Sequence, residues 1–226
     1  MDEKSAIVTG SSSGLGLEAS EYLLELGYMV FGLSQRGSDI VHSNYFDIVC
    51  DLSNEEDVEE FYRQVSETTN SIDVLVHCAG IGSVSPIIET SSREFERNLQ
   101  VNALGTFHLL KHFSRFIIPF ETKVISTVAF CTEQNLPLLA AISASKAAMK
   151  AILDSCEVEW RELGVNFSNL YPGPIDTPYW EKCEYPMPKG AVLSTSHFLY
   201  VLDMVVSSPA IMRFSNIQFR HRGSLV

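Results

Sequence analysis

Short runs of apolar residues alternate along the chain with longer stretches in which apolar residues recur every three or four positions. The short runs favour buried strands and the longer stretches favour amphipathic helices, so their alternation indicates a parallel sheet wrapped by helices. Seven strands are expected, at residues 6–10, 28–34, 46–52, 73–80, 123–128, 165–173 and 216–219. The pattern therefore predicts a doubly wound α/β fold in a single domain spanning residues 1–226.

Local signals mark where several helices begin. The first helix is expected over residues 15–26, and its apolar face is expected to consist of Leu15, Ala19, Tyr22, Leu23 and Leu26. Ser53 with Glu56, and Ser91 with Glu94, have the spacing of capping boxes at the starts of later helices. A longer helix, rich in alanine and methionine, is predicted over residues 145–160.

One segment, residues 176–196, follows no regular period. Its three prolines, two tyrosines and one tryptophan interrupt both helical and strand patterns. Long irregular segments in compact α/β domains often cover binding sites. This segment is therefore predicted to be an irregular lid over a site.

Charge and cysteine content narrow the function classes. The net charge of -12 disfavours binding to nucleic acid or to an anionic membrane surface. The five cysteines are scattered without a CxxC pair, which favours free thiols in a reducing cytoplasm over disulfides or a metal site. No long apolar run and no signal peptide are evident, so neither a membrane helix nor secretion is expected.

Three glycines between the first strand and the first helix form the strongest motif. Gly10 permits a tight turn, Gly14 allows the backbone to approach a pyrophosphate, and Gly16 lets the helix pack closely on the sheet. The helix N-terminus then presents free N–H groups to the phosphates. The turn residues expected to line this site also include Ser12, Ser13 and Leu15.

The end of the second strand bears on which dinucleotide is bound. An acidic residue there would bind the adenosine ribose of NAD, whereas a basic residue would bind the 2′-phosphate of NADP. Ser34 occupies the usual acidic position, and Arg36 follows two residues later. The sequence therefore favours NADP(H) over NAD(H).

These motifs together give a family resemblance. From residue 5 to about residue 178, the chain resembles the short-chain dehydrogenase/reductase family, whose members have a doubly wound Rossmann fold and bind a nicotinamide dinucleotide. The glycine turn matches, as does an aspartate after the third strand. The further cofactor-binding positions implied by the resemblance are Asp51, Leu52, Ala79, Gly80, Lys146, Pro172, Gly173, Ile175 and Thr177.

The resemblance also implies catalytic positions. Asn102 matches the asparagine that holds a catalytic water, Thr127 with neighbouring Ser126 matches the catalytic serine, and Lys146 matches the lysine at the nicotinamide ribose. Family resemblance further implies a homodimer or homotetramer built on the helices at 98–116 and 145–160. A small-molecule substrate is expected.

The catalytic tyrosine of that family has no counterpart here. Its position is Ile142, and isoleucine can neither donate nor accept a proton. Loss of general acid–base catalysis typically lowers the rate about 10²–10⁴-fold. A tyrosine shifted in register is excluded, because the chain has none between Tyr62 and Tyr171.

Three hypotheses follow. The first is an oxidoreductase with a substitute proton donor. That donor could be Tyr171, beside the Pro172–Gly173 motif, or Thr127 acting through water, or one of the lid residues Tyr179, Glu181, Cys183, Glu184 and Tyr185. The second is a non-redox elimination, isomerisation or ring closure. The third is a cofactor-binding sensor or structural partner without turnover.

Overall fold

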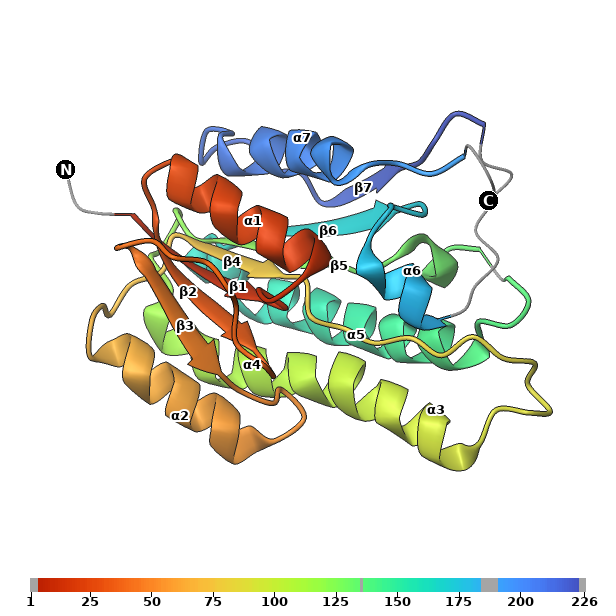
Figure 1. Ribbon diagram of the computed structural model, residues 1–226. Helices are drawn as coiled ribbons and strands as arrows, with labels where there is room; N and C mark the ends of the chain where they lie inside the picture. The colour runs from red at the N-terminus through yellow and green to blue at the C-terminus, as the bar shows by residue number, and fades with distance from the viewer. Residues whose placement is uncertain (1–3, 135, 184–190, 224–226) are drawn as a thin grey trace.

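Seven parallel strands form one sheet in the order β3-β2-β1-β4-β5-β6-β7 (Figure 1). They are β1 (Ser5–Thr9), β2 (Met29–Ser34), β3 (Tyr45–Val49), β4 (Val74–His77), β5 (Lys123–Thr127), β6 (Asn166–Pro172) and β7 (Asn216–Phe219). This computed structural model describes residues 4–134, 136–183 and 191–223. Each predicted strand is present, with ends displaced by at most three residues, so the doubly wound Rossmann fold is confirmed.

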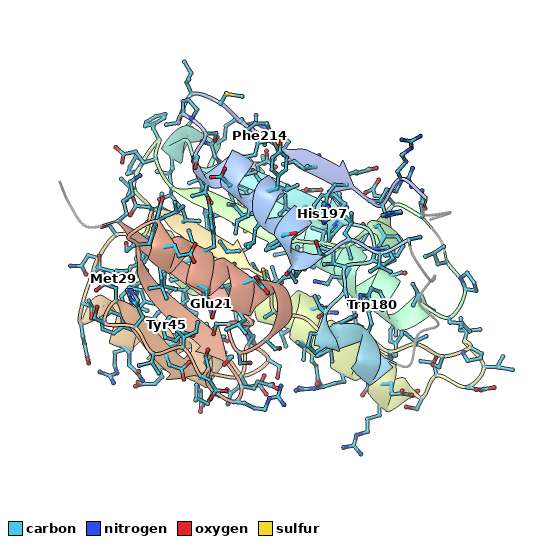
Figure 2. The ribbon with its side chains drawn as sticks, turned by 45° about the horizontal axis from the view of Figure 1, so that its top comes forward. Glu21, Met29, Tyr45, Trp180, His197 and Phe214 are labelled. Carbon is cyan, nitrogen blue, oxygen red and sulfur yellow. The ribbon has the colours of Figure 1, made fainter. Side chains whose placement is uncertain are left out.

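Helices cover both faces of the sheet. On one face α1 (Gly14–Glu25) lies beside α7 (Thr195–Val206), and Figure 2 labels Glu21 and His197 on this pair. The opposite face is covered by α2 (Glu55–Ser66), α4 (Gly105–Phe113) and α5 (Ala140–Glu159) (Figure 1). Each side has its own buried apolar cluster, as continuous apolar strands require.

The order of the strands sets the place of a ligand site. The chain runs outward from β1 to β2 and β3, and then returns to build β4 to β7 on the other side of β1. Ligands of open α/β sheets bind outside the carboxyl ends of the strands at the point where this direction reverses. Here that point lies between β1 and β4.

The first helix differs from its prediction at one end. Ala19 and Leu23 are buried as expected, but Leu26 is 45% exposed and Leu24 is buried in its place. The helix ends at Glu25, so Leu26 has left the helical face before its side chain can reach the sheet. The prediction for Leu26 was wrong because it extended the helical period past the true end.

One capping box is confirmed and the other is wrong. Ser91 and Glu94 exchange both hydrogen bonds of a capping box at the start of α3 (Ser92–Asn98). At α2 the N-cap is Asn54, whose side chain accepts from the N–H of Glu56. Ser53 instead donates to Asp51 through both its N–H and its hydroxyl, which ties it to the preceding turn.

Two further segments differ from expectation. The stretch predicted as one helix at 98–116 comprises the end of α3, a π-helical stretch (Leu99–Leu104), α4, and a 3₁₀ turn (Ser114–Phe116). The helix expected from residue 145 begins at Ala140, which places Ile142 and Lys146 one turn apart on the same helix.

The predicted irregular lid contains a short helix, α6 (Pro178–Cys183). Proline at a first helical position is favourable because its missing N–H would have no partner there. Residues 184–190 of that lid lie outside the described part of the chain. Among the described residues, no helix is both long enough and apolar enough to cross a membrane.

Candidate functional site

A cavity of about 580 Å³ opens at the carboxyl ends of the strands. Every residue predicted to contact a dinucleotide lines it, together with Thr127 and Ile142. Those dinucleotide positions are Gly10, Ser12, Ser13, Gly14, Leu15, Gly16, Ser34, Arg36, Asp51, Leu52, Ala79, Gly80, Lys146, Pro172, Gly173, Ile175 and Thr177. The fold thus brings together, in one hollow, residues that lie up to 167 positions apart in the sequence, from Gly10 to Thr177.

The turn between β1 and α1 has the geometry of a phosphate-binding loop. Gly10 and Gly14 have φ angles of 73° and 56°, a region that L side chains rarely adopt. A Cβ added at Gly16 would overlap the carbonyl oxygen of Gly10, so only glycine lets α1 approach the turn. The open N-terminus of the twelve-residue α1 faces the cavity, where its N–H groups and dipole favour an anion.

The residues at the ends of β2 and β3 form the other rim. The Ser34 hydroxyl is buried and has no hydrogen-bond partner among the described residues. Arg36 is exposed on the same rim. A buried hydroxyl without a partner, next to a cation and to a helix N-terminus, is suited to a phosphorylated ligand.

Asp51 is held in its ionised form. Burial acts to raise its pKa, but hydrogen bonds from Ser53 and Gln35 and the charge of Arg97 lower it below its usual value. The Arg97 guanidinium lies 3.7 Å from the Asp51 carboxylate. Asp51 therefore presents a fixed acceptor on the wall of the cavity.

Lys146 is the buried cation of the site. Its ammonium donates to the carbonyl oxygen of Thr127 at 2.8 Å, and burial lowers its pKa to about 8. The hydroxyl of Thr127 donates to the carbonyl oxygen of His77 at 3.1 Å. Lys146 and Thr127 thus lie side by side where β5 meets α5, and both line the cavity.

Asn102 and Ser126 are close to the cavity but do not line it. The Asn102 amide donates to the carbonyl of Ile81 at 2.8 Å and to Ser145, and its oxygen accepts from the N–H of Ile81 at 2.9 Å. The Asn102 side chain thus holds the loop that follows β4 in place through hydrogen bonds to Ile81. Ser126 is fully buried behind Thr127, and its hydroxyl has no partner among the described residues.

Tyr171 is separated from the cavity. It is 2% exposed, and its hydroxyl donates to Asn216 on β7 at 3.1 Å. Burial, reinforced by Glu133 and Asp154, raises the pKa of its phenol to about 12. The structure therefore does not bring this candidate proton donor to Lys146 or Thr127.

Ile142 forms part of an apolar compartment at the far end of the cavity. It is 6% exposed and packs with Cys131 and Leu139. Val84, Ala129, Leu136 and the ring of Tyr179 pack around this cluster. No sequence motif marks this wall, because its members come from four separate loops and helices that only the tertiary fold brings together.

The described residues hold no metal cluster, and they include only some of the proposed lid donors. Within residues 4–134, 136–183 and 191–223, no group of three or more histidine, cysteine or acidic side chains is arranged to hold a metal ion. Of the proposed lid donors, Glu184 and Tyr185 lie outside the described residues. Tyr179 does line the cavity, as does Trp180, which Figure 2 labels on α6.

Comparison with known proteins gives the family. A model of the short chain dehydrogenase family matches residues 4–186. The 3-amino-tetrahydro-pyrrolizinone reductase of Xenorhabdus hominickii is 31% identical over 186 residues, which cover 80% of this chain and 65% of that protein. The NADPH-dependent 3-dehydrocapnine reductase of Ornithobacterium rhinotracheale is 28% identical over 194 residues, covering 79% of this chain and 68% of the relative.

Solved structures agree with the fold. The alcohol dehydrogenase of the archaeon Thermococcus sibiricus, complexed with 5-hydroxy-NADP, superposes with a TM-score of 0.89 at 24% identity, over 99% of this chain and 98% of that one. A serine dehydrogenase complexed with NADP⁺ superposes with a TM-score of 0.87 at 18% identity, over 96% and 94% of the two chains. The present chain spans about two thirds of the length of the curated relatives it matches. It belongs to the short chain dehydrogenase family.

Proposed function

We propose that the chain is an NADP(H)-dependent oxidoreductase that acts on a small uncharged molecule, with Ile142 at the position of the family's catalytic tyrosine. The observation that carries this proposal is the continuity of one cavity. It runs from Arg36 and the glycine turn, past Lys146, to the apolar compartment at Ile142. A dinucleotide bound at the first end would place its reactive ring beside the second.

Several observations favour NADP(H). Arg36 can form charge-assisted hydrogen bonds with a 2′-phosphate, and the Ser34 hydroxyl beside it is buried without a partner among the described residues. One relative is named an NADPH-dependent reductase, and one structural neighbour contains 5-hydroxy-NADP. All of these favour the phosphorylated cofactor.

The chain's own residues would then act on the substrate. The bound cofactor would supply or accept a hydride. Thr127 would donate its hydroxyl to the substrate oxygen after releasing the carbonyl of His77, and the Lys146 ammonium would stabilise negative charge that develops nearby. Because Ile142 cannot transfer a proton, the proton must come from another group in the compartment.

A second function is favoured by the same isoleucine. Ile142, Leu139 and Cys131 give the compartment an apolar wall, which suits a bound molecule that undergoes no redox change. On this alternative the chain is a non-redox isomerase, lyase or cyclase, or a cofactor-dependent sensor. It would bind the dinucleotide as tightly but would not consume it.

We also propose that the chain works as one domain in a homodimer or homotetramer. Leu104 and Phe107, at the start of α4, are 42% and 47% exposed, in the region that the family resemblance assigns to subunit contacts. Light scattering after size exclusion tests this directly. A mass of 25.2 kDa at micromolar concentration would contradict it.

The first experiment is a titration with NADPH and with NADH, followed by nicotinamide fluorescence. We expect NADPH to bind at least about tenfold more tightly than NADH, since one charge-assisted contact is worth roughly 1.5–3 kcal/mol. If neither NADPH nor NADH binds, both functions proposed above are overturned. If the two bind with equal affinity, the cofactor site is still supported, but the preference for NADP(H) is not.

A further inference from the structure

We propose that the hydroxyl of Tyr179 is the catalytic proton donor of this chain, acting on the carbonyl oxygen of a small uncharged substrate held against Ile142. The inference rests on the oxidoreductase function proposed above. It gives the proton a source within the described residues and defines the class of substrate. The donor comes from α6, whereas the family's tyrosine position lies on α5.

The loop after β4 leaves space at Gly82 for the Tyr179 hydroxyl. A Cβ added at Gly82 would overlap the Tyr179 hydroxyl and would approach Cδ1 of Ile142 to 2.7 Å. The Tyr179 hydroxyl and the Ile142 side chain therefore converge on the same space next to Gly82. Any residue other than glycine at position 82 would displace one of them.

Lys146 lies beside the same loop. A Cβ added two residues earlier, at Gly80, would lie 3.1 Å from the Lys146 ammonium. Gly80, Gly82, Lys146 and Tyr179 all line the cavity. The phenol and the ammonium are thus presented along one short stretch of backbone, which Asn102 fixes through its two hydrogen bonds to Ile81.

The surroundings of the phenol identify the class of substrate. The ring of Tyr179 packs against the cluster of Cys131, Leu139 and Ile142. Among the described lining residues, the ionised side chains are Arg36 and Asp51 at the adenosine end and Lys146 between the two ends. A charged substrate would lose its hydration against the apolar wall formed by Cys131, Leu139 and Ile142, so an uncharged carbonyl compound is expected.

The step balances without a further reactant. A dinucleotide held by the glycine turn and Lys146 would supply the hydride that reduces the carbonyl carbon and would itself be oxidised. The C=O π electrons move to the oxygen, which takes the proton from Tyr179 as the phenol O–H bond breaks and the alcohol O–H bond forms. The phenolate, stabilised by the nearby Lys146 ammonium, recovers its proton from water.

The proposal is tested with Tyr179→Phe, which removes only the hydroxyl. The matched control is Tyr200→Phe, at an exposed tyrosine on α7. The binding probe is N-cyclohexylformamide, an uncharged compound whose carbonyl accepts a hydrogen bond but is not reduced. Its affinity for protein saturated with NADPH is measured by titration calorimetry.

We expect Tyr179→Phe to weaken formamide binding about fivefold or more and to keep its NADPH affinity within about twofold of wild type. The control Tyr200→Phe is expected to bind both the formamide and NADPH as wild type does. With cyclohexanone as substrate, we expect kcat to fall at least about 10²-fold with little change in KM. The binding measurement decides the proposal by itself where cyclohexanone is turned over poorly.

The contrary outcomes are distinct. Equal formamide affinity in wild type and Tyr179→Phe, or no formamide binding to a protein that binds NADPH, overturns the role of Tyr179 and leaves the cofactor site standing. Failure to bind NADPH removes the proposed function, and the inference with it. An equal loss in Tyr200→Phe would show that the effect does not come from the cavity.

Discussion

Thr9 and His77 join the ends of two neighbouring strands beneath the cavity, with Thr9 Oγ1 2.7 Å from His77 Nδ1. On the other side of the ring, His77 Nε2 lies 2.8 Å from the hydroxyl of Thr106, which donates its own proton to the carbonyl of Asn102. The ring must therefore donate from Nε2 and accept at Nδ1. Thr9 in turn accepts from the N–H of Ala79 at 3.0 Å, which ties the cavity loop to the glycine turn.

This network makes the fold sensitive to acid. Burial lowers the pKa of His77 to about 3, against an ordinary value of 6.5. Between pH 6.5 and 3 the unfolded chain takes up a proton that the folded chain does not, so stability is lost as the pH falls through this window. We expect the wild-type stability, relative to His77→Asn, to fall by roughly 2–3 kcal/mol between pH 6.5 and 4.5.

Urea denaturation of both proteins at the two pH values measures this difference. The control is His42→Asn at an exposed histidine outside the network. A stability difference between wild type and His77→Asn that stays constant with pH would show that His77 is not held neutral by burial.

Lys146 gives a prediction of the same sign in the alkaline range: stability rises with pH. Burial lowers its pKa from 10.5 to about 8, so from pH 8 to 10.5 the unfolded chain binds the extra proton. Wild-type stability relative to Lys146→Met should therefore rise by roughly 2–3 kcal/mol between pH 8 and 10. Denaturation without cofactor checks this, with Lys150→Met, whose ammonium pairs with Asp154 near the surface, as control. No rise would mean that Lys146 keeps its charge in the folded state.

Arg36 should govern the choice of dinucleotide. Removing its guanidinium in Arg36→Ala is expected to weaken NADPH binding roughly tenfold or more, because a charge-assisted phosphate contact is lost. NADH has no 2′-phosphate, so its affinity should stay within about threefold. Fluorescence titration of both cofactors measures the two changes, and Arg93→Ala on α3 controls for loss of one surface charge. If Arg36→Ala weakens the binding of NADPH and NADH equally, Arg36 contributes to binding both dinucleotides and does not select between them.

The sheet and the glycine turn could be predicted because their signals are local. Buried parallel strands need continuous apolar runs, and the turn at Gly10 and Gly14 needs residues that tolerate positive φ angles. Both requirements can be recognised from a few consecutive residues of the sequence. The end of a helix is less strongly encoded, which is why the burial of Leu26 was mispredicted.

The substrate end of the site could not be predicted in the same way. Tyr171 lies next to the Pro172–Gly173 motif, but side chains alternate across a strand, and Tyr171 belongs to the buried cluster on the α5 side of the sheet. Tyr179 reaches the cavity because its six-residue helix packs on Ile142, a contact between segments 37 positions apart. The burial of Tyr171 away from the cavity and the position of Tyr179 within it could not be inferred from how close each residue is to a motif in the sequence.

Gly16 provides the last test, of the close approach between α1 and the turn. In Gly16→Ala the new methyl group would collide with the carbonyl of Gly10, so α1 must shift away from the phosphate position. We expect a loss of about 1–3 kcal/mol in stability and NADPH binding weakened at least about tenfold. Gly27→Ala is the control: its φ of 83° is also unfavourable for alanine, but its Cβ would meet no atom within 4 Å. That variant should lose roughly 1–2 kcal/mol and keep its NADPH affinity. Unchanged NADPH binding in Gly16→Ala would mean that the helix N-terminus does not hold the cofactor.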